Sequence, residues 1–153
     1  MSKLNQIDAA LLRALQRDAQ LTTQQLSELL NLSASQIGRR KARLEQEGYI
    51  ANYMARAAPD MLGLNVQAFV QVQMTDQTLG QTQSFLQLTQ QTPEITAAWT
   101  LTGEADYLLR VYCADLAALN LLVQKVLLPH PAIARVQSQI VMEQLKADGP
   151  LPI

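Results

Sequence analysis

The stretch "LSASQIGRRKARLEQEGYI", residues 32–50, contains the start and the end of one helix and four cations within five positions. Ser33 and Gln36 stand three positions apart, which is the spacing of a capping box, where each side chain accepts a hydrogen bond from the other residue's backbone N–H group. Gly48 suits the left-handed residue that ends a helix. The break before Ser33 is short, so the stretch predicts the second helix of a helix-turn-helix pair.

The first 50 residues show the same organisation in three segments. Asn5 and Thr22 stand at the starts of the two earlier segments, where they can cap a helix. Apolar residues recur at helical spacing in the three segments: Ile7, Leu11, Leu12 and Leu15; Leu26, Leu29 and Leu30; and Ile37 and Leu44. We expect three short helices that share one small core.

The cations of the third helix fall on two parts of its surface when residues are placed at about 100° per position. Arg39 and Arg43 point away from the apolar stripe, whereas Arg40 and Lys41 flank it. Guanidinium and amide groups suit base edges and phosphates, and free backbone amides at the helix start can hold a phosphate oxygen. The candidate DNA-binding residues are Ser33, Ser35, Gln36, Arg39, Arg40 and Arg43.

A second interpretation of this helix is a solvated face whose arginines pair with Glu45 and Glu47. Periodicity alone leaves both interpretations open, and the capped, tightly turned helix pair with its clustered arginines favours DNA. Lys41 departs from the pattern, because the position four residues after Ile37 should be apolar. The aliphatic stem of Lys41 can lie along the edge of the core.

The period changes from helical to extended after residue 64. The predicted elements are a strand over 66–74, a helix over 81–91, strands over 95–101 and 107–113, a helix over 116–127 capped by Asp115, and a strand over 136–142. This order is the split βαβ arrangement of a ferredoxin-like sandwich. We therefore expect an α+β protein, with an N-terminal winged helix-turn-helix domain over 1–50, a linker over 51–64 and a C-terminal ferredoxin-like βαββαβ sandwich over 65–153. Phe69 should face away from the helices.

The charge is unevenly distributed along the 153 residues, although the net charge is only −1. The first 52 residues hold seven cations and five anions, and the remainder holds five cations and eight anions. Such local clustering matters more for a phosphate backbone than the net charge does. No apolar run approaches the roughly 18 residues that span a bilayer, the N-terminus lacks a signal-peptide pattern, and there is one cysteine. Together these features favour the cytoplasm.

Residues with catalytic chemistry are few. His130 is the single histidine and stands between two prolines, where we expect a capping role. Cys113 ends a predicted strand and has no histidine nearby in sequence to activate it, so we expect a buried thiol. The chain has no glycine-rich phosphate loop and no Cys/His spacing suited to zinc. We therefore expect no enzyme, no metal site and no cofactor.

Residues 4–50 resemble the helix-turn-helix region of the Lrp/AsnC family of transcription regulators. The matching positions are Leu4, Asp8, Leu32, Ser33, Ile37, Arg40, Arg43, Leu44, Glu45, Gly48 and Ile50. Asn5 replaces the usual first aspartate, and Lys41 replaces a usual aliphatic residue. The resemblance implies double-stranded DNA as a partner.

The stretch "WTLTGEADYLLRVYCAD", residues 99–115, and the closing "IVMEQLK" resemble the effector-binding domain of the same family. Taken alone, Gly103 and Asp106 fit an ordinary turn. The resemblance implies dimers formed through the sheets, further assembly into tetramers or octamers, and a small effector, usually an amino acid, bound between dimers. The implied effector-binding residues are Thr100, Gly103, Glu104, Asp106, Leu116 and Gln139. The alternative is an amino-acid-sensing module without direct DNA readout, which would have no need of the basic helix.

Overall fold

The computed structural model describes residues 4–75 and 78–153 of the chain. These residues form two compact units. The N-terminal unit contains the described residues up to Arg56 together with Leu145–Ile153, and the sheet unit contains Ala57–Gln144. Among the described residues, no helix is long and apolar enough to cross a bilayer.

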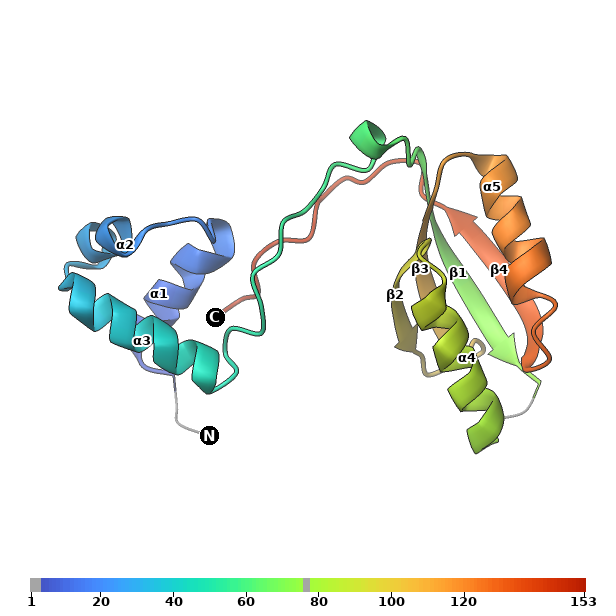
Figure 1. Cartoon of the computed structure of the whole chain (residues 1–153), viewed down its shortest axis with the longest axis horizontal. Helices are drawn as coiled ribbons and strands as arrows, with labels where there is room; N and C mark the ends of the chain where they lie inside the picture. Colours follow the sequence, from blue (N-terminus) through green and yellow to red (C-terminus); the bar gives the residue numbers. More distant parts are fainter. Residues whose placement is uncertain (1–3, 76–77) are drawn as a thin grey trace. The chain divides into compact units, whose positions relative to one another are not determined.

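Three helices form the N-terminal unit: α1 Gln6–Arg17, α2 Thr23–Leu30 and α3 Ala34–Gln46 (Figure 1). The predicted caps are confirmed, because Asn5 accepts a hydrogen bond from the Asp8 backbone N–H at 2.9 Å and complete capping boxes open α2 and α3. Asn31 takes the left-handed conformation between α2 and α3, with φ 56°. Gly48 does the same after α3, with φ 77°. Local hydrogen bonds therefore set the helix-turn-helix.

The three helices share a core of fully buried leucine and isoleucine side chains: Leu11, Leu26, Ile37 and Leu44. The predicted stripe of α1 was wrong at its first position, because Ile7 is exposed and the neighbouring Asp8 is buried. Asp8 precedes Leu11 and Leu15 by three and seven residues, so these three side chains lie on one helical face. Leu29, which was also expected in the core, is exposed.

Lys41 contacts an aromatic ring. Its Nζ lies over the ring of Tyr53, 4.9 Å from the ring centroid, which is cation–π geometry. The Tyr53 hydroxyl in turn donates a hydrogen bond to Glu45 at 2.9 Å. Burial, followed by the hydrogen bond and the negative charge of Glu45, raises the pKa of Tyr53 to about 12. Lys41 therefore attaches the segment after α3 to the helix.

The C-terminal tail, Leu145–Ile153, belongs to the N-terminal unit, whereas the sequence analysis assigned it to the ferredoxin-like domain. The Leu151 N–H donates to Gln16 Oε1 at 2.6 Å, and Gln16 Nε2 donates back to the Leu151 carbonyl at 3.4 Å. Arg13 donates to the carbonyl of Ile153 at 2.9 Å. The polar face of α1 thus satisfies the backbone of the tail, a pairing between distant segments that periodicity does not indicate.

The sheet unit has the predicted order of elements. They are β1 Val66–Met74, α4 Leu79–Gln91, β2 Ile95–Thr100, β3 Tyr107–Cys113, α5 Leu116–Leu121, a π-helical segment Leu122–Leu127, and β4 Ile133–Ile140. The four strands are antiparallel in the order β2-β3-β1-β4, which confirms the ferredoxin-like topology. The last strand begins three residues earlier than predicted, because Ile133 pairs with Met74 beyond a bulge at Ala134 of β4.

One face of the sheet is covered by α4 and α5, and the other is open (Figure 1). Val70 and Val72 of β1 and Leu109 of β3 are fully buried under the helices with Phe85 of α4. Phe69 lies on the opposite face, where it is only partly buried, as predicted.

Deleting residues 145–153 should lower the stability of the N-terminal unit by about 1–2 kcal/mol, because the hydrogen bonds to Arg13 and Gln16 are lost. The change can be measured by thermal unfolding followed by helical circular dichroism. Trp99, the single tryptophan, lies in the sheet unit, so its fluorescence provides an internal control that should hardly change. Equal loss in both signals would contradict the assignment of the tail to the N-terminal unit.

Tyr53 should ionise near pH 12 in the folded protein. The fold favours the neutral phenol, so the stabilisation is fully present below the ordinary tyrosine pKa of about 10 and is lost as the pH rises toward 12. Absorbance titration at 295 nm should show a late step that Tyr53→Phe removes and Tyr112→Phe retains. Persistence of that step in Tyr53→Phe would contradict the contact with Glu45.

Candidate DNA-binding surface and effector site

A hollow beside the first three turns of α3 brings together four of the six predicted DNA-binding residues. It is lined by Asn5, Gln36, Arg39, Arg40 and Arg43. Arg39 is exposed, and among the described residues no carboxylate lies within 4.0 Å of its guanidinium. A cationic hollow on a capped helix can receive a phosphate or the edge of a base.

Asp8 lies beneath this hollow and was missed as a functional residue in the sequence analysis. Its carboxylate is fully buried and accepts hydrogen bonds from Arg40 Nη1 at 2.8 Å and from Arg43 Nη2. The expectation that Arg43 points outward beside Arg39 was therefore wrong, because Arg43 turns toward the same buried carboxylate as Arg40. The three-residue spacing from Asp8 to Leu11 could have placed this aspartate on the buried face.

The start of α3 is held by its own side chains. Gln36 Oε1 accepts from the Ser33 N–H at 3.0 Å, and the Ser33 and Ser35 hydroxyl oxygens lie 3.1 Å apart. Bidentate reading of adenine needs both the oxygen and the nitrogen of an amide. Gln36 would have to leave its capping box to read a base in that way. DNA contact by Ser33, Ser35 and Gln36 stays a prediction.

The second candidate site is the turn between β2 and β3. Gly103 has φ 121°, a conformation that favours glycine. The Asp106 N–H donates to the Val72 carbonyl at 3.0 Å, and its carboxylate accepts from the Met74 N–H at 2.7 Å. Asp106 thus satisfies a backbone donor of β1 opposite the bulge of β4. This contact is structural, and a further contact of Asp106 with an effector stays a prediction.

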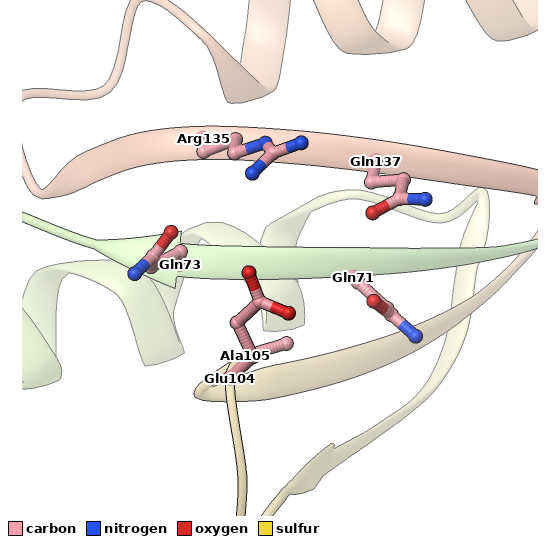
Figure 2. A pocket seen from close by; sticks show the side chains of 6 residues that line it. All are labelled: Gln71, Gln73, Glu104, Ala105, Arg135 and Gln137. Atoms are coloured by element: carbon pink, nitrogen blue, oxygen red, sulfur yellow. The ribbon is translucent and has the colours of Figure 1, made fainter.

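A polar hollow lies over the open face of the sheet beside this turn (Figure 2). Its lining residues are Gln71, Gln73, Glu104, Ala105, Arg135 and Gln137. The pairing of Gln71 with Gln137 and of Gln73 with Arg135 brings the side chains of β1 and β4 to the same face. The sequence analysis identified Glu104 and missed Arg135. The hollow encloses about 30 Å³, which holds a water molecule but not an amino acid.

The remaining predicted effector residues lie outside this polar hollow. Thr100 ends β2 and lines a separate apolar hollow with Phe85 and Trp99. Leu116 begins α5 and is exposed. Gln139 pairs with Phe69 on the open face. The fold of one chain therefore brings together only part of the predicted set.

His130 and Cys113 have structural contacts. His130 Nδ1 accepts from the Ala132 N–H at 3.3 Å, so the neutral ring carries its proton on Nε2, 2.8 Å from the Ser84 hydroxyl. Cys113 is buried, and burial, together with the charges of Glu94 and Asp115, raises the pKa of its thiol. A raised pKa lowers the fraction of reactive thiolate. Among the described residues, no group of three His, Cys, Asp or Glu side chains could hold a metal ion.

Two family models match the chain, one in each part. A model described as winged helix-turn-helix DNA-binding matches residues 4–51, and a model described as the Lrp/AsnC ligand binding domain matches residues 67–151. The first match contains α3 and its hollow, and the second contains the turn and the polar hollow.

The chain is also similar to whole regulators. It is 33% identical over 150 residues to the DNA-binding transcriptional activator DecR of Escherichia coli strain K12, covering 98% of this chain and 99% of that protein. It is 32% identical over 153 residues to the Bkd operon transcriptional regulator of Pseudomonas aeruginosa, covering 100% of both. A Neisseria meningitidis transcriptional regulator solved in complex with L-Met has a TM-score of 0.94 and 33% identity, covering 98% of this chain and 97% of that one. The chain belongs to the Lrp/AsnC family of DNA-binding transcriptional regulators.

Proposed function

We propose that the chain reads specific DNA sequences with α3 and that Arg39 makes the main base contact. The observation that carries this proposal is the exposed guanidinium of Arg39 beside the other cations of the hollow, with no ion-pair partner in the part of the chain that the structure describes. Arg40 and Arg43 each keep N–H donors beyond those bound to Asp8 and can contact phosphate. A dimer would place two such helices in successive major grooves, so the target is a rough palindrome with half-sites one or two helical turns apart.

Replacing Arg39 with alanine should weaken binding to the target duplex by about 1–3 kcal/mol, because a base contact is lost, and should weaken binding to shuffled DNA much less. The target is the duplex that the wild-type protein selects from a random-sequence pool, and affinity is measured by fluorescence anisotropy. Arg17→Ala, which removes an exposed cation of α1 outside the hollow, is the matched control. Equal losses of affinity for both duplexes would show that Arg39 contacts phosphate and not a base.

The effector of this chain is, in this proposal, an amino acid. Glu104 and Arg135 line the polar hollow with opposite charges, which can hold the ammonium and the carboxylate of one zwitterion. The similar Neisseria meningitidis regulator was solved with L-Met. Because the hollow of one chain is too small for an amino acid, the site is completed by another protomer.

The chain is a homo-oligomer in this proposal. Trp99 on the open face of the sheet is 45% exposed, and Phe69, Leu108 and Tyr112 lie on the same face. Side chains of this size in one face are typical of an interface between subunits. Dimers formed through the sheets would assemble further into tetramers or octamers. In this proposal the regulator acts in the prokaryotic cytoplasm, where its DNA target lies.

Thermal shift with each of the twenty amino acids should identify at least one that raises the unfolding temperature of the wild type. Glu104→Gln and Arg135→Gln should each reduce that shift, because each removes one charge that faces the zwitterion. Lys125→Gln, an exposed cation elsewhere in the sheet unit, should retain it. Light scattering with and without the active amino acid measures the accompanying change in mass. A full shift in both hollow variants would exclude this hollow as the effector site.

A further inference from the structure

Asp8 is the one carboxylate buried among the described residues. It lies in the core face of α1, in line with Leu11 and Leu15, where an apolar side chain would ordinarily stand. Replacing a buried ion cluster with well-packed apolar groups is often neutral or stabilising. Stability alone therefore does not account for an ionised side chain at this position.

The two partners of Asp8 both belong to the DNA-facing helix. Arg40 and Arg43 lie three positions apart on α3, and their side chains are 27% and 41% exposed. Each guanidinium gives one oxygen of Asp8 an N–H donor and lies at the border of the hollow that contains Arg39. One buried carboxylate thus fixes two guanidiniums relative to each other and to Arg39.

Asp8 also reduces the charge of this surface. Arg39, Arg40 and Arg43 carry three positive charges, and the carboxylate beneath them offsets one. Binding to DNA of any sequence depends on the number of phosphates that cations neutralise, whereas discrimination depends on the geometry of contacts to the bases. Asp8 offsets one positive charge and fixes the positions of the guanidiniums. It should therefore weaken binding to DNA of any sequence and preserve discrimination between sequences.

We propose that Asp8 is a positioning residue that determines the DNA specificity of the chain, by holding Arg40 and Arg43 in place and by limiting their attraction to phosphates of any sequence. This proposal rests on the proposed DNA readout by α3.

Asp8→Asn tests the proposal, because it removes the negative charge and keeps nearly the same shape. Binding to the selected target duplex and to a shuffled duplex is measured between 50 and 200 mM salt. Asp8→Asn should bind shuffled DNA more tightly than the wild type at low salt. Its plot of log affinity against log salt should be steeper by about 0.9 for each protomer that contacts the DNA. That slope corresponds to an extra loss of affinity of about 3.5-fold per protomer between 50 and 200 mM salt. The ratio of target to shuffled affinity should fall by roughly fivefold or more.

Asp18→Asn is the matched control, because it removes a carboxylate from the exposed end of α1, where the Asp18 side chain accepts a hydrogen bond from the Gln20 backbone N–H. It should leave the ratio unchanged and alter the salt dependence less than Asp8→Asn does. Asp8→Glu keeps the charge and displaces it, so it should lower the ratio while retaining the wild-type salt dependence. Circular dichroism verifies the fold of each variant, and if Asp8→Asn does not fold, the ratio of Asp8→Glu decides.

Three results would overturn the proposal in distinguishable ways. A wild-type protein that shows no preference for any duplex would overturn the proposed sequence readout and, with it, the role of Asp8. A wild-type preference that Asp8→Asn and Asp8→Glu both retain, with unchanged salt dependence, would overturn the role of Asp8 alone. A parallel loss of binding to both duplexes would identify Asp8 as purely structural and would also overturn the proposal.

Discussion

The N-terminal unit depends on the pairing of one buried carboxylate with two guanidiniums across α1 and α3. An unpaired carboxylate in the core would be strongly destabilising, so the burial of Asp8 requires that both helices be in place at the same time. The apolar contacts of Leu11, Ile37 and Leu44 pull these helices together without fixing their rotation. The ion cluster supplies that missing constraint, and it couples the core of the unit to the face that we propose contacts DNA.

In the sheet unit, too, a carboxylate has a structural role. Opposite the bulge of β4, the Met74 N–H donates to the carboxylate of Asp106, which anchors the turn that follows Gly103. The same turn presents Glu104 to the open face beside Arg135 (Figure 2). Glu104 and Ala105, which line the hollow, therefore lie between Gly103 and Asp106, which shape the turn. A change at Asp106 would alter the geometry of the proposed effector site.

Much of the architecture follows from local patterns in the sequence. The caps at Asn5, Thr22 and Ser33 and the alternation in β1 are local features, and the structure confirms them. Other features join residues that a helical wheel treats separately. They are the ion cluster, the burial of Asp8 in place of Ile7, and the contact of Lys41 with Tyr53. Such contacts depend on how the helices dock, so the direction of Arg43 could not be predicted from the wheel of α3 alone.

The candidate effector site also depends on contacts between segments that are distant in sequence. Glu104 was identified through resemblance, whereas Arg135 lies 31 positions away and reaches the hollow only because β4 pairs with β1. Leu116, by contrast, is exposed on the single chain.

The DNA-binding unit is discontinuous in sequence, since the chain passes from it to the sheet unit after Arg56 and returns at Leu145. An expression fragment ending near Arg56 would therefore leave the polar face of α1 without the backbone groups that Arg13 and Gln16 bind. A faithful minimal fragment would join the tail to the helices through an artificial loop. The sheet unit is joined to the DNA-binding unit by two connections, so an exchange of the sheet unit between relatives must preserve both.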